Sequence, residues 1–203
     1  MISEDRVVRD AARAALEGRL IVLPTDTVYG IGTRPDDAAA VVRVFTAKAR
    51  PRELALPVLV ASAEDAAEIA ALDDRAERLG RELWPGAATF ILPRTRRSAQ
   101  WDLGGDGSTI GVRVPAHPLA LAVLRRSGPL AMTSANRSGD ATPVDCDGVR
   151  SIFGDEVHVY VCDERSHADR PSTVIDLTQD APRVLREGEL DQSAVDALLI
   201  ERR

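Results

Sequence analysis

Side chains that could bind or orient a ligand follow the first strongly apolar run of the chain. Residues 20–23 are all Leu, Ile or Val, which predicts a strand buried on both faces, and Pro24 ends it. Hydroxyls and one carboxylate come next, on Thr25, Asp26, Thr27 and Tyr29. Open α/β sheets bind ligands at the carboxyl ends of their strands, so we expect a binding loop here that continues to Gly32. An ordinary polar turn is the alternative.

Three cations stand where they could meet an anion. Lys48 and Arg50 precede a proline, and if this segment is extended, both side chains point the same way and could hold a triphosphate. A basic turn exposed to solvent is the alternative. Arg113 alternates with apolar residues within a predicted strand, so it needs an anionic partner or a cleft to face. It is a candidate carboxylate clamp; the solvated face of a half-exposed strand is the alternative.

Polar residues also follow later predicted strands. Ser134 and Asn136 are suited to ribose or phosphate oxygens, although a turn or capping motif would use the same residues. The segment 172–176 and the segment 186–188 repeat the pattern of polar groups at strand ends.

Signatures of covalent catalysis and of common nucleotide folds are missing. There is no Walker spacing, and Gly30-Ile-Gly32 lacks the third glycine of a dinucleotide turn. His117, His158 and His167 show no pairing with a nucleophile and a carboxylate, so we expect them to be structural or exposed. Cys146 lies between two aspartates, which disfavour a thiolate. The available cations and hydroxyls suit a reaction driven by positioning and charge stabilisation.

The elements that must position these residues alternate between helix and strand. The first helix is expected to begin at Ser3 and end at Gly18, and a third begins at the capping pattern Ser62–Asp65. The other expected helices are 36–47, one ending at 83, 118–126 and 191–203, and the expected strands are 20–23, 56–60, 89–92, 109–114, 130–133, 157–161, 173–177 and 183–186. Alternating elements with short late strands favour a three-layer α/β domain with a mixed sheet.

Composition limits the class of protein. The 203 residues suit one domain, 1–203, and with 44% hydrophobic but only 3% aromatic residues the core must be built from Ala, Val and Leu. No membrane span or secretory signal is visible, so we expect a cytoplasmic protein. Cys146 and Cys162 lack metal-ligand spacing and are expected to be reduced thiols, and no metal site is predicted. The net charge of -6 argues against a generally basic nucleic-acid binder.

An ordered set of short motifs spans the chain from about residue 15 to 190 and resembles the YrdC/TsaC family of L-threonylcarbamoyladenylate synthases. The motifs are Pro24–Gly30, Lys48–Pro51, Leu56–Val60, Trp84–Gly86, Gly111–Pro115 with His117 and Pro118, Ser134–Gly139, Pro171–Asp176 and Val184–Gly188. The resemblance implies a YrdC/RibB-like α/β fold whose twisted mixed sheet has a concave, positively charged face. It resembles the short, single-domain form of the family.

The resemblance also implies a nucleotidyltransferase that uses L-threonine, bicarbonate or carbon dioxide, and ATP. The products would be threonylcarbamoyl-AMP and pyrophosphate, and separate proteins would use the former to modify adenosine in tRNA. Magnesium would accompany the triphosphate. Position by position, the implied L-threonine contacts are Thr27, Arg113 and Ser172, and the implied ATP contacts are Lys48, Arg50, Thr109, Met132, Ser134, Asn136, Thr142 and Arg186. Lys48 and Arg50 would balance the charge that develops during catalysis.

The chain departs from the family pattern at two places. Leu54 stands where a Lys or Asn is usual, so an ATP contact is missing or is supplied by Arg52. Asp169-Arg170 replaces small residues. Two rival functions stay open: the carbamoyl-adenylate chemistry of the related domain in hydrogenase-maturation proteins, and a module that binds double-stranded RNA or tRNA without chemistry of its own.

Overall fold

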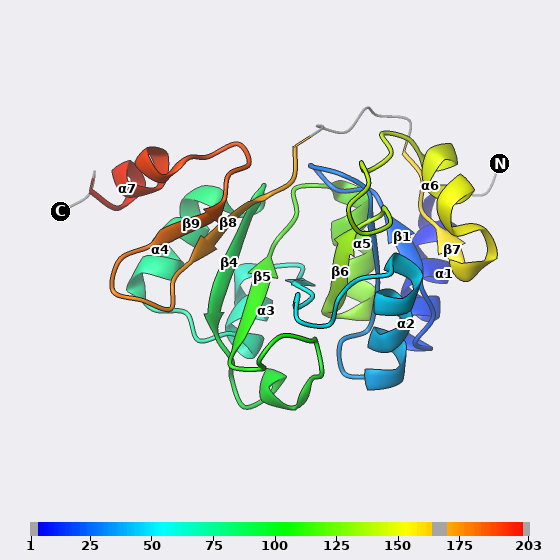
Figure 1. Cartoon of the computed structure of the whole chain (residues 1–203), viewed down its shortest axis with the longest axis horizontal. Helices are drawn as coiled ribbons and strands as arrows, with labels where there is room; N and C mark the ends of the chain where they lie inside the picture. Colours follow the sequence, from blue (N-terminus) through cyan, green and yellow to red (C-terminus); the bar gives the residue numbers. More distant parts are fainter. Residues whose placement is uncertain (1–3, 164–169, 201–203) are drawn as a thin grey trace.

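A mixed, twisted sheet organises the chain (Figure 1). The computed structural model describes residues 4–163 and 170–200, and within them nine strands run in the order β7-β1-β2-β6-β3-β5-β4-β8-β9. The strands are β1 (Ile21–Leu23), β2 (Gly30–Thr33), β3 (Val58–Leu59), β4 (Ala88–Pro93), β5 (Thr109–Arg113), β6 (Leu130–Ser134), β7 (Val159–Tyr160), β8 (Thr173–Asp176) and β9 (Arg183–Arg186). Parallel and antiparallel pairs both occur, as the short late strands predicted.

Helices lie on both faces of the sheet. They are α1 (Glu4–Leu16), α2 (Ala38–Lys48), α3 (Ala63–Ile69), α4 (Asp74–Leu83), α5 (Pro118–Ser127), α6 (Cys146–Phe153) and α7 (Gln192–Ile200), with short 3₁₀ turns η1 (Ser98–Gln100) and η2 (Gly154–Glu156). Capping marks several starts: the side chains of Asp37 and Ser62 accept the backbone N–H of Ala40 and Asp65. Gly18, with φ 72°, follows the end of α1 as predicted.

Alternation along the strands separates two apolar cores. In β1, Val22 belongs to the larger core, which includes α2, whereas Ile21 and Leu23 belong to a smaller one with α1 and α5. Successive strand residues point to opposite faces, so these two clusters lie on opposite sides of the sheet. The three-layer prediction is confirmed. That residues 1–203 form a single domain stays a prediction.

The expectation that the binding loop continues through Gly30 to Gly32 is wrong. Gly30–Thr33 forms β2, which pairs antiparallel with both β1 and β6. A Cβ on Gly32 would overlap the Ala131 carbonyl oxygen and the Met132 side chain, so glycine permits the close approach of β6. The strand was not predicted because its two glycines have low strand propensity. The binding loop is therefore confined to the connection between β1 and β2.

The prediction of reduced cysteines is also wrong in this structure. Cys146, the first residue of α6, forms a disulfide with Cys162, which follows β7; their Cα atoms are 5.6 Å apart. Helix α6 was not predicted, although Asp145 caps it through the Gly148 N–H. The remaining helices and strands occur close to their expected positions, while Ser3 lies outside the described residues.

In the part of the chain that the structure describes, no helix combines the length and the apolar character needed to cross a membrane.

Candidate active site

A cavity of about 730 Å³ opens on one face of the sheet, a size typical of small-molecule sites. Alternate strand residues form its floor, including Thr109, Gly111 and Arg113 of β5. The residues between them, Ile110 and Val112, belong to the larger core on the opposite face. The period of two therefore places β5 side chains alternately in the site and in the core.

Most of the predicted site residues meet in this cavity. Nine of the eleven line it, namely Thr27, Arg50, Thr109, Arg113, Met132, Ser134, Thr142, Ser172 and Arg186. They come from strands and connections far apart in the sequence, from the β1–β2 connection to β9. Lys48 and Asn136 do not line it; they lie behind one wall.

Lys48 is the only lysine in the sequence, and it is 1% exposed. Its Nζ donates to the carbonyl oxygens of Ser134 at 2.5 Å and Asn136 at 2.6 Å, and to Asn136 Oδ1 at 3.2 Å. An ammonium carries three hydrogens, so three acceptors use all of them. Burial, helped by the charges of Arg50 and Arg137, lowers the pKa of Lys48 to about 8.

The expectation that Lys48 and Arg50 share one side of an extended segment is wrong. Lys48 ends α2, and Ala49 adopts a left-handed conformation with φ 49°. This reversal sends Lys48 inward and leaves Arg50 on the cavity wall. Asn136 Nδ2 donates to the carbonyls of Arg137 and Asp140, so Lys48 and Asn136 together shape the loop after β6.

Arg50 and Arg186 bring positive charge into the cavity. Arg50 donates through Nε to Leu54 O at 2.9 Å and through Nη2 to Ala55 O at 3.2 Å. Burial and the charge of Arg186 lower the pKa of Arg50, and burial and Arg113 lower that of Arg186. These like charges are brought together at one site, and arginine keeps its proton regardless, so the cavity attracts anions.

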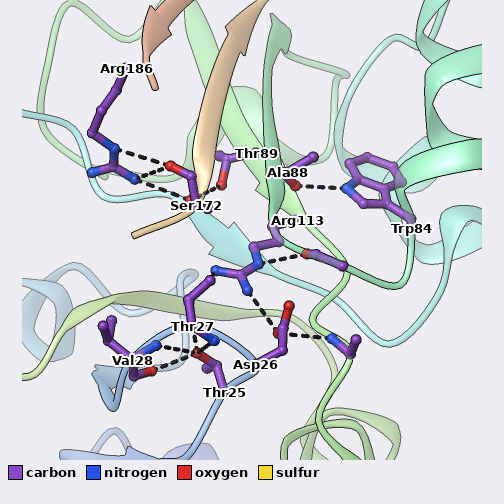
Figure 2. A network of polar contacts seen from close by, with 12 residues as sticks. Thr25, Asp26, Thr27, Val28, Trp84, Ala88, Thr89, Arg113, Ser172 and Arg186 are labelled. Carbon is purple, nitrogen blue, oxygen red and sulfur yellow. Dashed lines mark hydrogen bonds and ion pairs between the residues drawn. The ribbon is translucent and has the colours of Figure 1, made fainter. Parts of the chain in front are cut away.

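Arg113 crosses from β5 to the β1–β2 connection (Figure 2). Its Nε donates to Gly86 O at 2.9 Å, Nη1 to Thr27 Oγ1 at 2.9 Å, and Nη2 to Asp26 Oδ1 at 2.7 Å. Burial lowers the pKa of Arg113, and the carboxylate of Asp26 opposes that shift. The sequence argument required an anionic partner or a cleft, and Arg113 has both.

Ser172 links two other lining residues (Figure 2). Its Oγ lies 2.8 Å from Thr89 Oγ1 and accepts from Arg186 Nη2 at 3.1 Å, while its carbonyl accepts from Arg186 Nε at 3.1 Å. Thr89 was not predicted, although the alternation of Thr89 and Ile91 in a strand could have indicated it. Thr25, a hydroxyl of the expected binding loop, also lines the cavity. Thr133 and the neighbours of Thr142, namely Ala141, Pro143 and Val144, line it too but carried no comparable signal.

Some expected candidates lie elsewhere. Tyr29 is fully buried and donates its hydroxyl to Asp163 O, so it belongs to the core. His117 is buried against Asp163 at 2.8 Å, consistent with a structural histidine. Arg52 pairs with Asp102 and is not among the residues that line the cavity, so its contact with ATP in place of Leu54 stays a prediction. His167 and Asp169 lie outside the described residues.

The donor set does not suit a resident metal ion. The described lining of the cavity contains no Asp or Glu, and residues 4–163 and 170–200 hold no group of three His, Cys, Asp or Glu side chains arranged for a metal. Divalent magnesium prefers carboxylates and phosphate oxygens. A magnesium ion at this site would therefore depend on the phosphates of a nucleotide.

Comparison with known proteins agrees with this geometry. The family model described as "Telomere recombination" (Sua5, yciO, yrdC) matches residues 13–188. A putative threonylcarbamoyl-AMP synthase of Mycobacterium tuberculosis is 40% identical over 195 residues, which cover 96% of this chain and 89% of that protein.

Two crystal structures are similar throughout the chain. Pyrococcus abyssi Sua5 complexed with L-threonine has a TM-score of 0.88 at 34% identity, with 99% of this chain and 59% of that one covered. Escherichia coli YciO has a TM-score of 0.85 at 31% identity, with 92% and 91% covered. Most of the predicted motif residues line one cavity, the family model matches residues 13–188, and the relatives are similar over nearly the whole chain. The chain therefore belongs to the Sua5/YciO/YrdC family.

Proposed function

We propose that this chain is a threonylcarbamoyl-AMP synthase, which converts L-threonine, bicarbonate or carbon dioxide, and ATP into threonylcarbamoyl-AMP and pyrophosphate. The observation that carries the proposal is a single cavity that holds three arginines and several hydroxyls, with no carboxylate in its described lining. Such a site can accept a triphosphate and an amino-acid carboxylate together. Relatives at 31–40% identity bear this name.

The proposed reaction has two steps. The amine of threonine adds to carbon dioxide and loses a proton, which gives a carbamate. A carbamate oxygen then attacks the α-phosphorus of ATP, the bond from that phosphorus to the bridging oxygen breaks, and pyrophosphate leaves. No enzyme nucleophile is needed, in keeping with the weak candidates for one.

We assign Arg50 and Arg186 to the phosphates, together with the hydroxyls of Thr109, Ser134 and Thr142 and the backbone of Met132. Arg113, Thr27 and Ser172 are assigned to L-threonine. Lys48 and Asn136 would act on ATP through the loop that they hold, because a direct phosphate contact would require Lys48 to give up hydrogen bonds. ATP would bring magnesium with it as part of the substrate.

The product would pass to separate proteins that modify tRNA, and we expect this to take place in the cytoplasm. RNA binding without chemistry gains no support from a cavity of small-molecule size in a chain of net charge -6. The two functions respond differently to salt: RNA affinity should fall steeply as salt rises, whereas thermal stabilisation by ATP and threonine should change less.

A pyrophosphate-release assay tests the proposal. ATP and bicarbonate are supplied with L-threonine, with L-serine, or with no amino acid. Release that depends on threonine and exceeds the release with serine is expected. Release indifferent to the amino acid would reject the substrate.

A further inference from the structure

Arg113 enters the cavity with its charge already paired inside the protein. The side chains of Arg113 and Asp26 are 7% and 18% exposed, and Nη2 lies 2.7 Å from Oδ1. Arg113 lines the cavity, but Asp26 does not. The carboxylate therefore contacts the arginine from outside the space that a substrate would fill.

Asp26 is itself anchored by a second donor. The same Oδ1 accepts the backbone N–H of Ala116 at 2.9 Å, in the connection between β5 and α5. A carboxylate oxygen held by two donors has little freedom to turn, and a charge-assisted hydrogen bond is stronger than a neutral one. Asp26 thus joins the β1–β2 connection both to the β5–α5 connection and to the guanidinium of Arg113.

The other two cavity arginines are held differently. Arg50 donates to backbone carbonyls, Arg186 donates to the carbonyl and hydroxyl of Ser172, and neither forms an ion pair with a carboxylate among the described residues. Among the residues that the structure describes, Arg113 alone of the three receives a fixed counter-charge. A paired arginine binds a further carboxylate through its orientation more than through net charge.

We propose that Asp26 is a positioning residue that holds Arg113 in the orientation needed to bind the amino-acid carboxylate. This inference rests on the proposed function, because it assigns Arg113 to L-threonine. Asp26 does not contact the substrate. It acts through the hydrogen bond to Nη2, so its acceptor oxygen matters more than its charge.

Two substitutions separate the acceptor from the charge. Asp26→Asn keeps an oxygen that can accept from both Arg113 and Ala116, whereas Asp26→Ala removes it. Asp36 provides the matched control, since it forms a comparable pair with Arg34, at 2.7 and 2.9 Å, away from the cavity. Threonine-dependent pyrophosphate release is measured for the wild type and for each variant, with KM determined for both threonine and ATP.

Asp26→Ala is expected to raise the KM for threonine about tenfold or more, with the KM for ATP within about twofold of wild type. Asp26→Asn should keep the KM for threonine at or below the wild-type value, and Asp36→Ala should change neither KM. A threonine KM that is unchanged or lowered in Asp26→Ala, or raised equally in Asp26→Asn, would overturn the positioning role. Equal increases in both KM values would also overturn it. If the wild type releases no pyrophosphate in response to threonine, the proposed function itself fails.

Discussion

Raising the pH from 7 to 10 should remove the proton of Lys48 in the folded protein well before a lysine in water would lose it. Burial takes the ammonium out of water, and the charges of Arg50 and Arg137 repel it, which lowers the pKa from 10.5 to about 8. Three oxygen acceptors at 2.5 to 3.2 Å act in the opposite direction, because they favour the charged form. A pKa near 8 means that burial and repulsion outweigh these hydrogen bonds.

The difference between 10.5 and about 8 corresponds to about 3 kcal/mol. The unfolded chain binds this proton more tightly than the folded protein does. Between pH 8 and 10.5 the unfolded state therefore carries more protons, and the contribution of Lys48 to the free energy of unfolding rises with pH. Below pH 8 both states are protonated, and the charged side chain lowers stability by the full amount.

Because Lys48 is the only lysine, protein labelled with ¹³C-lysine should give one side-chain NMR signal to follow. Its titration midpoint is expected near pH 8 in the folded protein and near 10.5 in concentrated urea. Urea unfolding of wild type and Lys48→Met offers a second measurement. The unfolding free energy of the wild type minus that of the variant should rise by about 1.4 kcal/mol per pH unit within this window. A folded-state midpoint near 10.5 would refute the reasoning and show that the three acceptors prevail.

Three further outcomes are expected. Arg50→Ala should reduce threonine-dependent pyrophosphate release by orders of magnitude, because it removes a cation from the cavity; unchanged turnover would refute its assignment. Reduction of the Cys146–Cys162 disulfide, which joins residues 16 apart, should cost about 3 kcal/mol and lower Tm by about 6–12 °C in a thermal melt; no response would mean that the thiols are already reduced. Gly188→Ala should lower both Tm and turnover, because its Cβ would lie 2.6 Å from Thr173 N beside Ser172; wild-type values would contradict this packing.

Matched controls accompany these three measurements. Arg81→Ala removes an exposed arginine of α4 and should leave turnover unchanged. A variant with both cysteines replaced by serine should melt at the same temperature with and without reductant. Gly80→Ala places a Cβ at an ordinary 3.4 Å from Trp84 and should not lower turnover.

Much of the site could be predicted because its residues belong to local patterns. Alternation along residues 109–114 separates the residues that face the cavity from those that face the core within one strand. Caps such as Ser62 mark helix starts through hydrogen bonds to a residue only three positions further along the chain. The motif resemblance supplied the remaining members. As a result, nine of the eleven predicted residues line one cavity.

The partners of these residues depend on contacts between distant segments. Lys48 meets the carbonyls of Ser134 and Asn136, and Arg113 meets Asp26, across separations of 86 to 88 residues. The pairing of β2 with β6 shows the same dependence, since Gly30 and Gly32 carry no strand propensity and become a strand only where the neighbouring backbone approaches closely. Sequence alone therefore determined which residues have chemistry and on which side of a strand they lie. Only the tertiary structure decided which hydrogen-bond partners they have, because burial and sheet pairing bring those partners together from distant parts of the chain.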